Sequence, residues 1–366
     1  MYQVNVSFSD GTKPLWYSVS SQFRDLISDR ADAPLVALLI PAMARGEAIH
    51  VEGVISEKLY YNLSGLYQRI LQSIIPSLHL IDIYPSEVQS SSQKALGVAT
   101  GFSAGIDSFS ALADHHYNKD VPAGFQLTHL LYNNVGSHAG GGEILFKKRY
   151  EALKPLVDER IGLPFVAVNS NVQSFYKGFS FQQTHTPRNA SVALLLQNGI
   201  GRYLYASAYT YTDTFIGKTD SNAYSDLITL PLLSTESLEA FSVGSEYTRV
   251  QKTLQVAEIE DSYQALDVCV RGDHESGNCS VCWKCMRTQL TLDIAGILDR
   301  YTNVFDLEAY QRQRSAYIVR TLQDKNVFSQ EIISFAAVRE FEFPPVLKLQ
   351  ADFPPLQYFV KKISRY

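Results

Sequence analysis

Short apolar runs alternate with longer amphipathic segments through the middle of the chain, between residues 96 and 207. Each run has the length of a buried strand, and the segments between them carry apolar residues at helical spacing. The runs cover residues 96–99, 127–132, 165–168 and 203–207, and the helical segments begin at residues 111, 143 and 191. This alternation predicts an α/β fold with a parallel sheet and helices on both faces. Ligands of such sheets bind at the carboxyl ends of the strands.

The pattern before this core predicts a small α+β accessory domain over residues 1–92. Strands are expected at residues 2–8, 50–54 and 78–83, and helices at residues 35–44 and 56–74. A polar stretch at residues 86–94 is the best candidate for a linker. The region contains no motif that indicates chemistry. We therefore expect it to dock a protein partner or a second copy of the chain, as in a homodimer.

The pattern after residue 298 predicts helices at residues 307–322 and 329–341, and proline pairs at 344–345 and 354–355 interrupt it. The chain is thus expected to have three parts: residues 1–92, a core at residues 93–297 and a helical C-terminal cap at residues 298–366.

Composition narrows the class of protein. The net charge of −5 argues against non-specific binding of nucleic acid. No apolar run approaches the roughly 20 residues that cross a membrane, and the N-terminus lacks the basic start and apolar core of a signal peptide. We therefore expect a cytoplasmic protein that does not insert into membranes.

All four cysteines lie close together in the sequence, at Cys269, Cys279, Cys282 and Cys285. Two overlapping Cys-x-x-Cys steps place three thiolates in one turn. Cys269, directly after a strand expected at residues 265–268, would supply the fourth thiolate. Four sulfur ligands suit tetrahedral Zn²⁺, and a site with four protein ligands is structural. An iron–sulfur cluster also uses four cysteines and stays open as an alternative. Arg271, Lys284 and Arg287 are near enough in sequence to balance the thiolate charge.

The chain between the first core strand and the first core helix is rich in small residues. It consists of Ser103, Ala104, Gly105, Ile106, Asp107 and Ser108. A strand, a small-residue turn and a helix N-terminus together form an anion site, because backbone N–H groups can approach the ligand closely. A phosphate or pyrophosphate is the expected ligand. An ordinary helix cap is the alternative interpretation.

Together these segments resemble the QueC family of PP-loop enzymes, the 7-cyano-7-deazaguanine synthases, over roughly residues 95–290. The loop resembles the family's Ser-Gly-Gly-x-Asp-Ser, with Ala104 in place of the first glycine, a position where φ > 0 would strain alanine. Thr186-Pro187-Arg188-Asn189 resembles the family's Pro-x-Arg-Asn, and Cys285-Met286-Arg287 resembles the end of its zinc segment.

Further matches to the family are single residues. His138 and Glu143 correspond to a segment after the second strand, and Asp213 to an aspartate after a later strand. The chain departs from the family at residues 217–226, where members carry a Tyr-Pro-Asp-Cys-Arg sequence, so the substrate pocket is the least similar part.

The resemblance implies an adenine nucleotide α-hydrolase-like fold and an AMP-forming carbon–nitrogen ligase. A carboxylate similar to 7-carboxy-7-deazaguanine would attack the α-phosphate of ATP, giving an acyl-adenylate and pyrophosphate. Ammonia or another amine would then give an amide, and a second ATP a nitrile. Residues 103–108 would bind the nucleotide, with Asp107 helping to position Mg²⁺.

The resemblance also implies roles outside the loop. Arg188 would pair with phosphate or carboxylate, His138 would accept a proton, and Asn189 and Asp213 would bind substrate. Lys252 and Arg249 are weaker candidates for phosphate contacts, and His185 is a weaker candidate base. Glu143 is expected to cap its helix.

Three other functions stay open at this stage. The acceptor amine could belong to a protein or peptide, as in QueC-like components of antiphage defence systems. A PP-loop sulfur transferase acting on tRNA would need a cysteine outside the metal cluster, and none is present. A nucleotide-sensing scaffold would bind ATP without releasing pyrophosphate.

Overall fold

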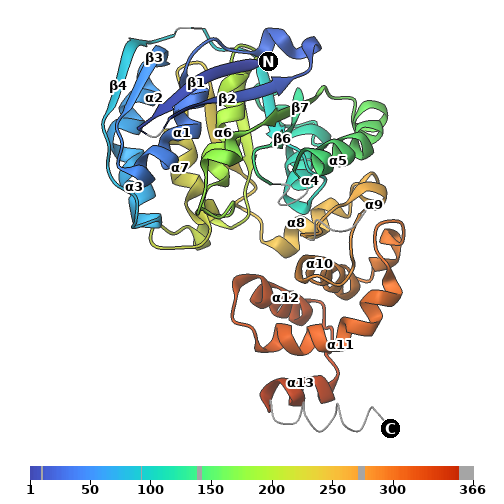
Figure 1. Ribbon diagram of the computed structural model, residues 1–366. Helices are drawn as coiled ribbons and strands as arrows, with labels where there is room; N and C mark the ends of the chain where they lie inside the picture. Colours follow the sequence, from blue (N-terminus) through green and yellow to red (C-terminus); the bar gives the residue numbers. More distant parts are fainter. Residues whose placement is uncertain (10, 92, 138–141, 271–276, 354–366) are drawn as a thin grey trace. The chain divides into compact units, whose positions relative to one another are not determined.

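The computed structural model describes residues 1–9, 11–91, 93–137, 142–270 and 277–353. Its centre is a seven-stranded sheet in the order β1-β2-β7-β6-β5-β8-β9 (Figure 1). The strands are β1 (Tyr2–Phe8), β2 (Gly11–Val19), β5 (Gly97–Gly101), β6 (His129–Asn134), β7 (Phe165–Ser170), β8 (Ile200–Ala206) and β9 (Glu239–Val243). The sheet is mostly parallel, because only β1 and β2 run antiparallel to their neighbours. The α/β prediction is confirmed at this level.

The order of the parallel strands reverses next to β5. The chain passes from β5 outward to β6 and β7, then returns to the other side of β5 with β8 and β9. Such a reversal leaves a crevice outside the carboxyl ends of the two central strands, where α/β proteins bind ligands. The serine- and glycine-containing loop follows β5 directly in the chain.

Helices cover both faces of the sheet, since successive side chains of a strand point to opposite faces. Tyr132 of β6 stacks on Phe146 of α5 (Gly142–Leu156), with ring centroids 5.3 Å apart. Its neighbour Leu131 belongs instead to the core that includes Val192 of α6 (His185–Leu195). Burial on both sides explains why these strands are continuous apolar runs rather than alternating ones.

The N-terminal residues join the same sheet. β1 and β2 form a hairpin, and residues 17–19 of β2 pair with residues 168–170 of β7. α1 (Asp32–Arg45) packs against α6, and the Asp32 carboxylate accepts hydrogen bonds from Ser56 and from Gln197 Nε2 at 2.8 Å. The packing therefore ties residues 1–56 closely to the parallel strands.

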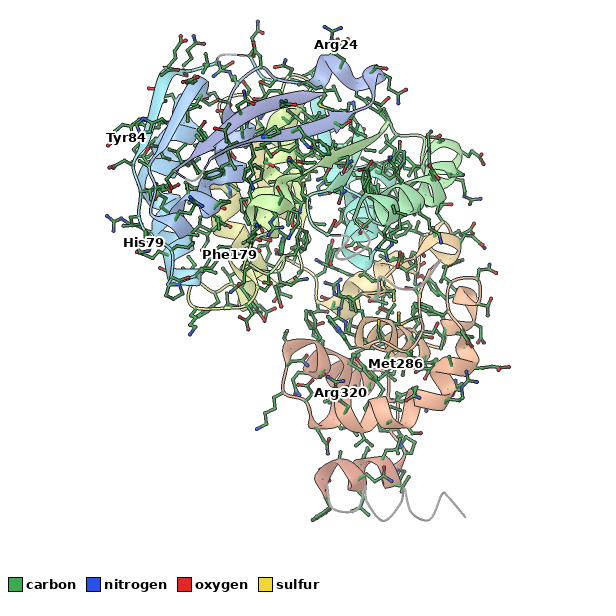
Figure 2. The ribbon with its side chains drawn as sticks, viewed as in Figure 1. Arg24, His79, Tyr84, Phe179, Met286 and Arg320 are labelled. Carbon is green, nitrogen blue, oxygen red and sulfur yellow. The ribbon has the colours of Figure 1, made fainter. Side chains whose placement is uncertain are left out.

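A second, two-stranded parallel sheet consists of β3 (Ile49–Ser56) and β4 (Ile83–Gln89), connected by α2 (Glu57–Tyr61), residues 62–66 and α3 (Tyr67–Ile74). The strand expected at residues 78–83 is wrong, because the strand begins at Ile83 and continues through part of the expected linker. The side chains of β4 are mostly exposed and polar, so the sequence pattern did not indicate a strand there. Tyr84 of β4 is exposed (Figure 2). Its ring stacks on that of His50, with 4.9 Å between the ring centroids.

The chain forms two compact units, and their limits differ from the three-part division expected from sequence. The first contains residues 1–103 and 111–246, and the second residues 104–110 and 247–366. α7 (Asp226–Leu232) completes the first unit, while α4 (Ile106–Leu112) begins in the second unit and ends in the first.

The second unit is helical. It contains α8 (Arg249–Val256), α9 (Ser262–Ala265), α10 (Trp283–Ile294), α11 (Leu307–Gln323), α12 (Val327–Val338) and α13 (Pro345–Asp352). Leu290, Ile318 and Ile332 form its core, and Met286 of α10 is buried while Arg320 of α11 is exposed (Figure 2). The expected helices at residues 307–322 and 329–341 are confirmed within a few residues. The strand expected at residues 265–268 is wrong, since α9 ends at Ala265 and the next residues have no regular structure.

Among the described helices, none combines the length and apolar character that crossing a membrane requires.

Candidate functional site

The loop before α4 is held in an unusual backbone conformation. Ala104 is fully buried and has φ = 58°, a left-handed value that side chains other than glycine rarely adopt. Its carbonyl accepts a hydrogen bond from the Asp267 N–H at 2.9 Å, and the Ser108 hydroxyl donates to Gly105 O at 3.0 Å. The strain expected at this position is thus present, because the neighbouring residues hold the loop in place.

Asp107 is held by two cations from α8. Arg249 binds it with both terminal nitrogens, with Nη1–Oδ1 at 2.7 Å and Nη2–Oδ2 at 2.8 Å, and Lys252 Nζ lies 3.5 Å from Oδ1. Burial alone would raise the pKa of Asp107, but the charges of Arg249 and Lys252 outweigh it and lower the pKa below its ordinary value. Asp107 therefore orients two cations beside the loop and is ionised at neutral pH.

Positive charge exceeds negative charge around this pair. The Lys252 side chain is only 2% exposed, and the buried Arg287 guanidinium is close enough to Arg249 for their repulsion, after burial, to lower the Arg287 pKa to about 10. Asp107 and Glu331 are the carboxylates that face these three cations, and burial raises the pKa of Glu331. Burying cations is costly unless carboxylates or other anionic groups accompany them. The arrangement gathers three buried cations beside two carboxylates.

Lys284 lies between this cluster and the cysteines. Burial, then the charges of Arg249 and Arg287, lower its pKa, while Asp107 and Cys282 act in the opposite direction. Its charge is therefore shared between the Asp107 cluster and the thiolates. The sequence pattern indicated Lys284 and Arg287 only as balancing charges for the cysteines, and gave no signal that both also approach Asp107.

The four cysteines form a compact cluster. The Sγ atoms of Cys269, Cys279, Cys282 and Cys285 all lie within 4.8 Å of one another, and none forms a disulfide. The Cys269–Cys282 and Cys282–Cys285 sulfur distances are 4.0 Å and 3.5 Å. Tetrahedral Zn²⁺ with Zn–S bonds of about 2.3 Å would separate its ligands by roughly 3.8 Å. The cluster therefore fits one zinc ion.

Local structure fixes the ligands before any metal binds. Cys282 precedes the first residue of α10, and Cys285 lies in that helix's first turn. Ser280 has φ = 61° and Gly277 has φ = 71°, which fold the turn tightly. The Asn278 amide ties it to the preceding segment, because it accepts from Val268 N at 2.8 Å and donates to Leu266 O at 2.7 Å.

Arg188 of α6 is a second buried cation, in the first unit. It is 0% exposed, stacks on Tyr176 with its guanidinium carbon 3.8 Å from the ring centroid, and donates to Gln173 Oε1 and to Val135 O. Nε and Nη2 have no acceptor among the described residues. Burial lowers its pKa to about 10, so it remains charged near neutral pH. A desolvated guanidinium with unused donors is suited to bind a carboxylate or phosphate.

Gly136 makes room for Arg188. A Cβ atom at this position, where φ is 112°, would lie 2.6 Å from Arg188 Nη1 and 2.1 Å from Gln173 Oε1. The segment after β6 therefore requires glycine for two reasons, its backbone conformation and the close approach of the Arg188 pair.

Other polar residues at the start of α6 form a buried network. Asn189 Oδ1 accepts from Asn133 Nδ2 at 3.0 Å, and His185 Nδ1 lies 2.7 Å from the Tyr205 hydroxyl. Thr186 Oγ1 donates to Asp226 Oδ1 at 2.6 Å. Burial raises the pKa of Asp226 to about 7. Nothing in the sequence distinguishes Asp226 from other acidic residues at helix starts, so pattern analysis missed it.

Asp213, which was expected at the site, forms hydrogen bonds within its own turn. Asp213 Oδ2 accepts from Thr210 N at 3.1 Å and from Thr210 Oγ1 at 2.6 Å, which caps a short helical turn. Its carboxylate therefore already has a local structural function. His138 lies outside the described residues. Glu143 is in the first turn of α5, where it pairs with Lys147 at 2.7 Å.

The structure thus brings the predicted residues together in two groups, one in each unit: Arg188 with Asn189, and Asp107 with Arg249 and Lys252. Comparisons with known protein families, with curated proteins and with solved structures found no match. The fold and the site define a class: an α/β protein with a mostly parallel sheet and a four-cysteine cluster that could bind zinc.

Proposed function

We propose that this protein activates a carboxylate with ATP as an acyl-adenylate, releasing pyrophosphate, and then transfers the acyl group to ammonia or another amine, releasing AMP. The observation that carries the proposal is the buried cation cluster around Asp107, at the end of the loop whose sequence resembles a PP-loop. Negative charge builds up on the α-phosphate and on the departing pyrophosphate during adenylation, so a site for this reaction needs fixed cations.

The residues of the cluster would divide this work. Arg249, fixed by two bonds to Asp107, offers an oriented guanidinium, and Lys252 offers a compact charge that burial keeps from water. Since Arg249 engages both Asp107 oxygens, Mg²⁺ would be bound mainly by phosphate oxygens and water. Within the first unit, the two Arg188 nitrogens that have no acceptor among the described residues are suited by themselves to bind a carboxylate.

The test is pyrophosphate release from ATP and Mg²⁺, with and without 7-carboxy-7-deazaguanine. Lys252→Met removes one of the two α8 charges beside Asp107, and we expect it to reduce release about 100- to 1,000-fold. Lys154→Met is the matched control, because Lys154 is exposed and pairs only with Asp158 in the next helical turn. It should leave the rate unchanged.

Two results would contradict the proposal. Equal pyrophosphate release by wild type and Lys252→Met would remove the cluster from the reaction. Calorimetry could instead show saturable ATP binding while no pyrophosphate is released in the presence of the carboxylate. This result would favour the nucleotide-sensing scaffold.

A further inference from the structure

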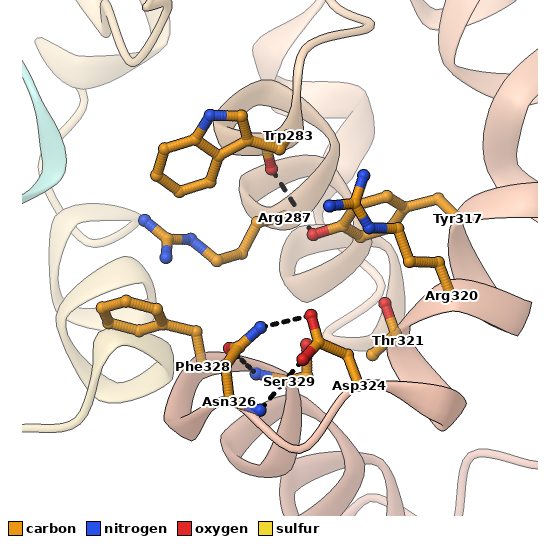
Figure 3. A pocket seen from close by; sticks show the side chains of 9 residues that line it. All are labelled: Trp283, Arg287, Tyr317, Arg320, Thr321, Asp324, Asn326, Phe328 and Ser329. Atoms are coloured by element: carbon orange, nitrogen blue, oxygen red, sulfur yellow. Dashed lines mark hydrogen bonds between the residues drawn. The ribbon is translucent and has the colours of Figure 1, made fainter.

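A small pocket opens in the helical unit, between α10, α11 and the start of α12 (Figure 3). Its volume is about 80 Å³. A cavity of about 150 Å³ admits benzene, and one water needs about 10–15 Å³. The pocket can therefore hold several waters or one small polar group, but not a whole aromatic ring. Its lining consists of Trp283, Arg287, Tyr317, Arg320, Thr321, Asp324, Asn326, Phe328 and Ser329.

Arg287 forms the inner wall of this pocket. Its guanidinium lies between two aromatic rings, 5.2 Å from the Trp283 centroid and 4.1 Å from the Phe328 centroid (Figure 3). The residue is only 7% exposed, and its buried Nε has no acceptor among the described residues. A guanidinium so far removed from water is costly unless an anion accepts its hydrogen bonds. Both rings are within the distance at which an aromatic face attracts a guanidinium.

The opposite wall adds positive charge. Arg320 extends from α11, and the N-terminus of the 12-residue helix α12 faces the pocket, with Asn326 Oδ1 capping Ser329 N at 3.0 Å. The carboxylate in the lining, Asp324, is engaged by Asn326, which donates its backbone N–H at 3.0 Å and also its amide nitrogen. The pocket lining therefore presents two guanidiniums and a helix N-terminus with one carboxylate, which is already hydrogen-bonded, while Asp107 and Glu331 act on Arg287 from outside the lining.

We propose that this pocket binds an oxyanion, a carboxylate or phosphate group at the end of a larger ligand, with Arg287 as its principal receptor and Arg320 as its second. Both groups match the planar fork of arginine. The rest of the ligand extends out of the pocket, past the half-exposed Trp283. Arg287 also belongs to the Asp107 cluster, but Arg320 and Asn326 take no part in the proposed adenylation, so a variant of Arg320 tests this inference separately.

Trp283 provides a local signal for binding. The chain has two tryptophans, so Trp16→Phe leaves Trp283 as the only one. The fluorescence of this variant would be titrated with sodium acetate and with inorganic phosphate, at an ionic strength held constant with chloride. We expect a saturable change with at least one of the two anions. Saturation by acetate alone assigns a carboxylate ligand, and saturation by phosphate alone assigns a phosphate ligand.

Two further variants test the assignment in the same background. Arg287→Met should abolish the saturable change, and Arg320→Gln should weaken binding about tenfold. Arg312→Gln is the control, because Arg312 is exposed on the same helix and pairs with Glu308. If Arg287→Met melts without cooperativity, the Arg320→Gln titration alone decides.

The proposal is overturned if neither anion gives saturation, or if binding is unchanged in Arg320→Gln. The fluorescence change could also be abolished by Lys252→Met and left intact by Arg320→Gln. That result would assign the anion to the Asp107 cluster and would overturn the proposal as well. In contrast, failure of pyrophosphate release together with intact anion binding would contradict only the proposed function.

Discussion

Asp226 is a buried carboxyl group whose protonation differs between the folded and unfolded chain. Burial raises its pKa from 3.8 to about 7. Between about pH 4 and pH 7 the carboxyl group of Asp226 is therefore protonated in the folded protein and ionised in the unfolded chain. The contribution of Asp226 to stability is therefore greatest below about pH 4 and is lost as the pH rises towards 7. A difference of about three pKa units corresponds to roughly 4 kcal/mol as an upper limit.

Asp226→Asn should remove this loss. The amide oxygen can still accept the Thr186 hydroxyl, and the side chain has no proton to lose. Urea unfolding at pH 5 and pH 8 would measure the effect. We expect the free energy of unfolding of the variant, relative to wild type, to be about 2–4 kcal/mol higher at pH 8 than at pH 5. Asp220→Asn, at an exposed position, is the control. A gain no larger than that of the control would show that Asp226 is ionised in the folded protein.

Single residues were predictable where the backbone or the ligand chemistry restricts the choice of amino acid. Ala104 was recognisable as a strained position because it replaces glycine in a loop that resembles a known motif, and its φ of 58° agrees. Asp226 was not recognisable, since its pKa depends on burial by residues distant in the sequence. Arg249 and Lys252 were weak candidates for the same reason, as Asp107 lies more than 140 residues before them.

At the scale of elements, α10 depends on the cysteine cluster for its start. Cys282 lies at its N-terminal boundary without a side-chain capping bond, and Cys285 occupies its first turn. Zinc would bind both thiolates and so fix the helix end from which Arg287 extends. Free energies of roughly 10–16 kcal/mol accompany such binding in small zinc sites, which exceeds the stability of most domains.

We therefore expect Cys285→Ser to lose bound zinc and to unfold the helical unit at a lower temperature. Metal analysis of purified protein should give one zinc per wild-type chain, and circular dichroism would follow unfolding. Met286→Leu, at the adjacent buried position, should retain the metal. Visible absorption typical of an iron–sulfur cluster, or full zinc content in Cys285→Ser, would contradict this assignment.

The elements that sequence patterns predicted well are those buried on both faces or on one regular stripe. β5, β6, β7 and β8 are apolar runs, and α11 and α12 have clear helical periods. β4 was misplaced because most of its side chains are exposed and polar, which is typical of linkers as well as edge strands. β9 and α13 are short and were not predicted, since pattern methods need several periods to find an element.

At the scale of the whole molecule, the N-terminal region is part of the main sheet's structure. Tyr17 of β2 is fully buried, and its hydroxyl lies 3.0 Å from Ser191 Oγ of α6. Removal of residues 1–92 would expose the edge of β7 and the apolar side of α6. We expect the shortened chain to be insoluble or without cooperative unfolding, as expression and circular dichroism would show.

Asp32→Ala is a milder form of the same test. It leaves the Ser56 and Gln197 donors without their shared acceptor, and we expect a loss of about 2–4 kcal/mol. A well-folded, cooperative chain that lacks residues 1–92 would instead support an independent accessory domain.

The assembly of the site could be predicted only in part. Local sequence identified the loop at Ser103–Ser108, the four cysteines and Arg188, because each is defined by a short motif. The charge excess around Asp107 and the pocket beside Arg287 depend on helices that follow the loop by more than 140 residues, so no local pattern contains them.

The helical unit is discontinuous in the chain, since it includes residues 104–110 as well as residues 247–366. This has a consequence for inheritance. A gene segment that encoded only residues 247–366 would carry Arg249 and Lys252 into a new protein without the aspartate that orients them, and the donor gene would keep Asp107 without its cations. Recombination at the unit boundary would therefore give two defective products. The two units are expected to be inherited and to diverge together, as one reading frame, rather than to be exchanged among genes as separate modules.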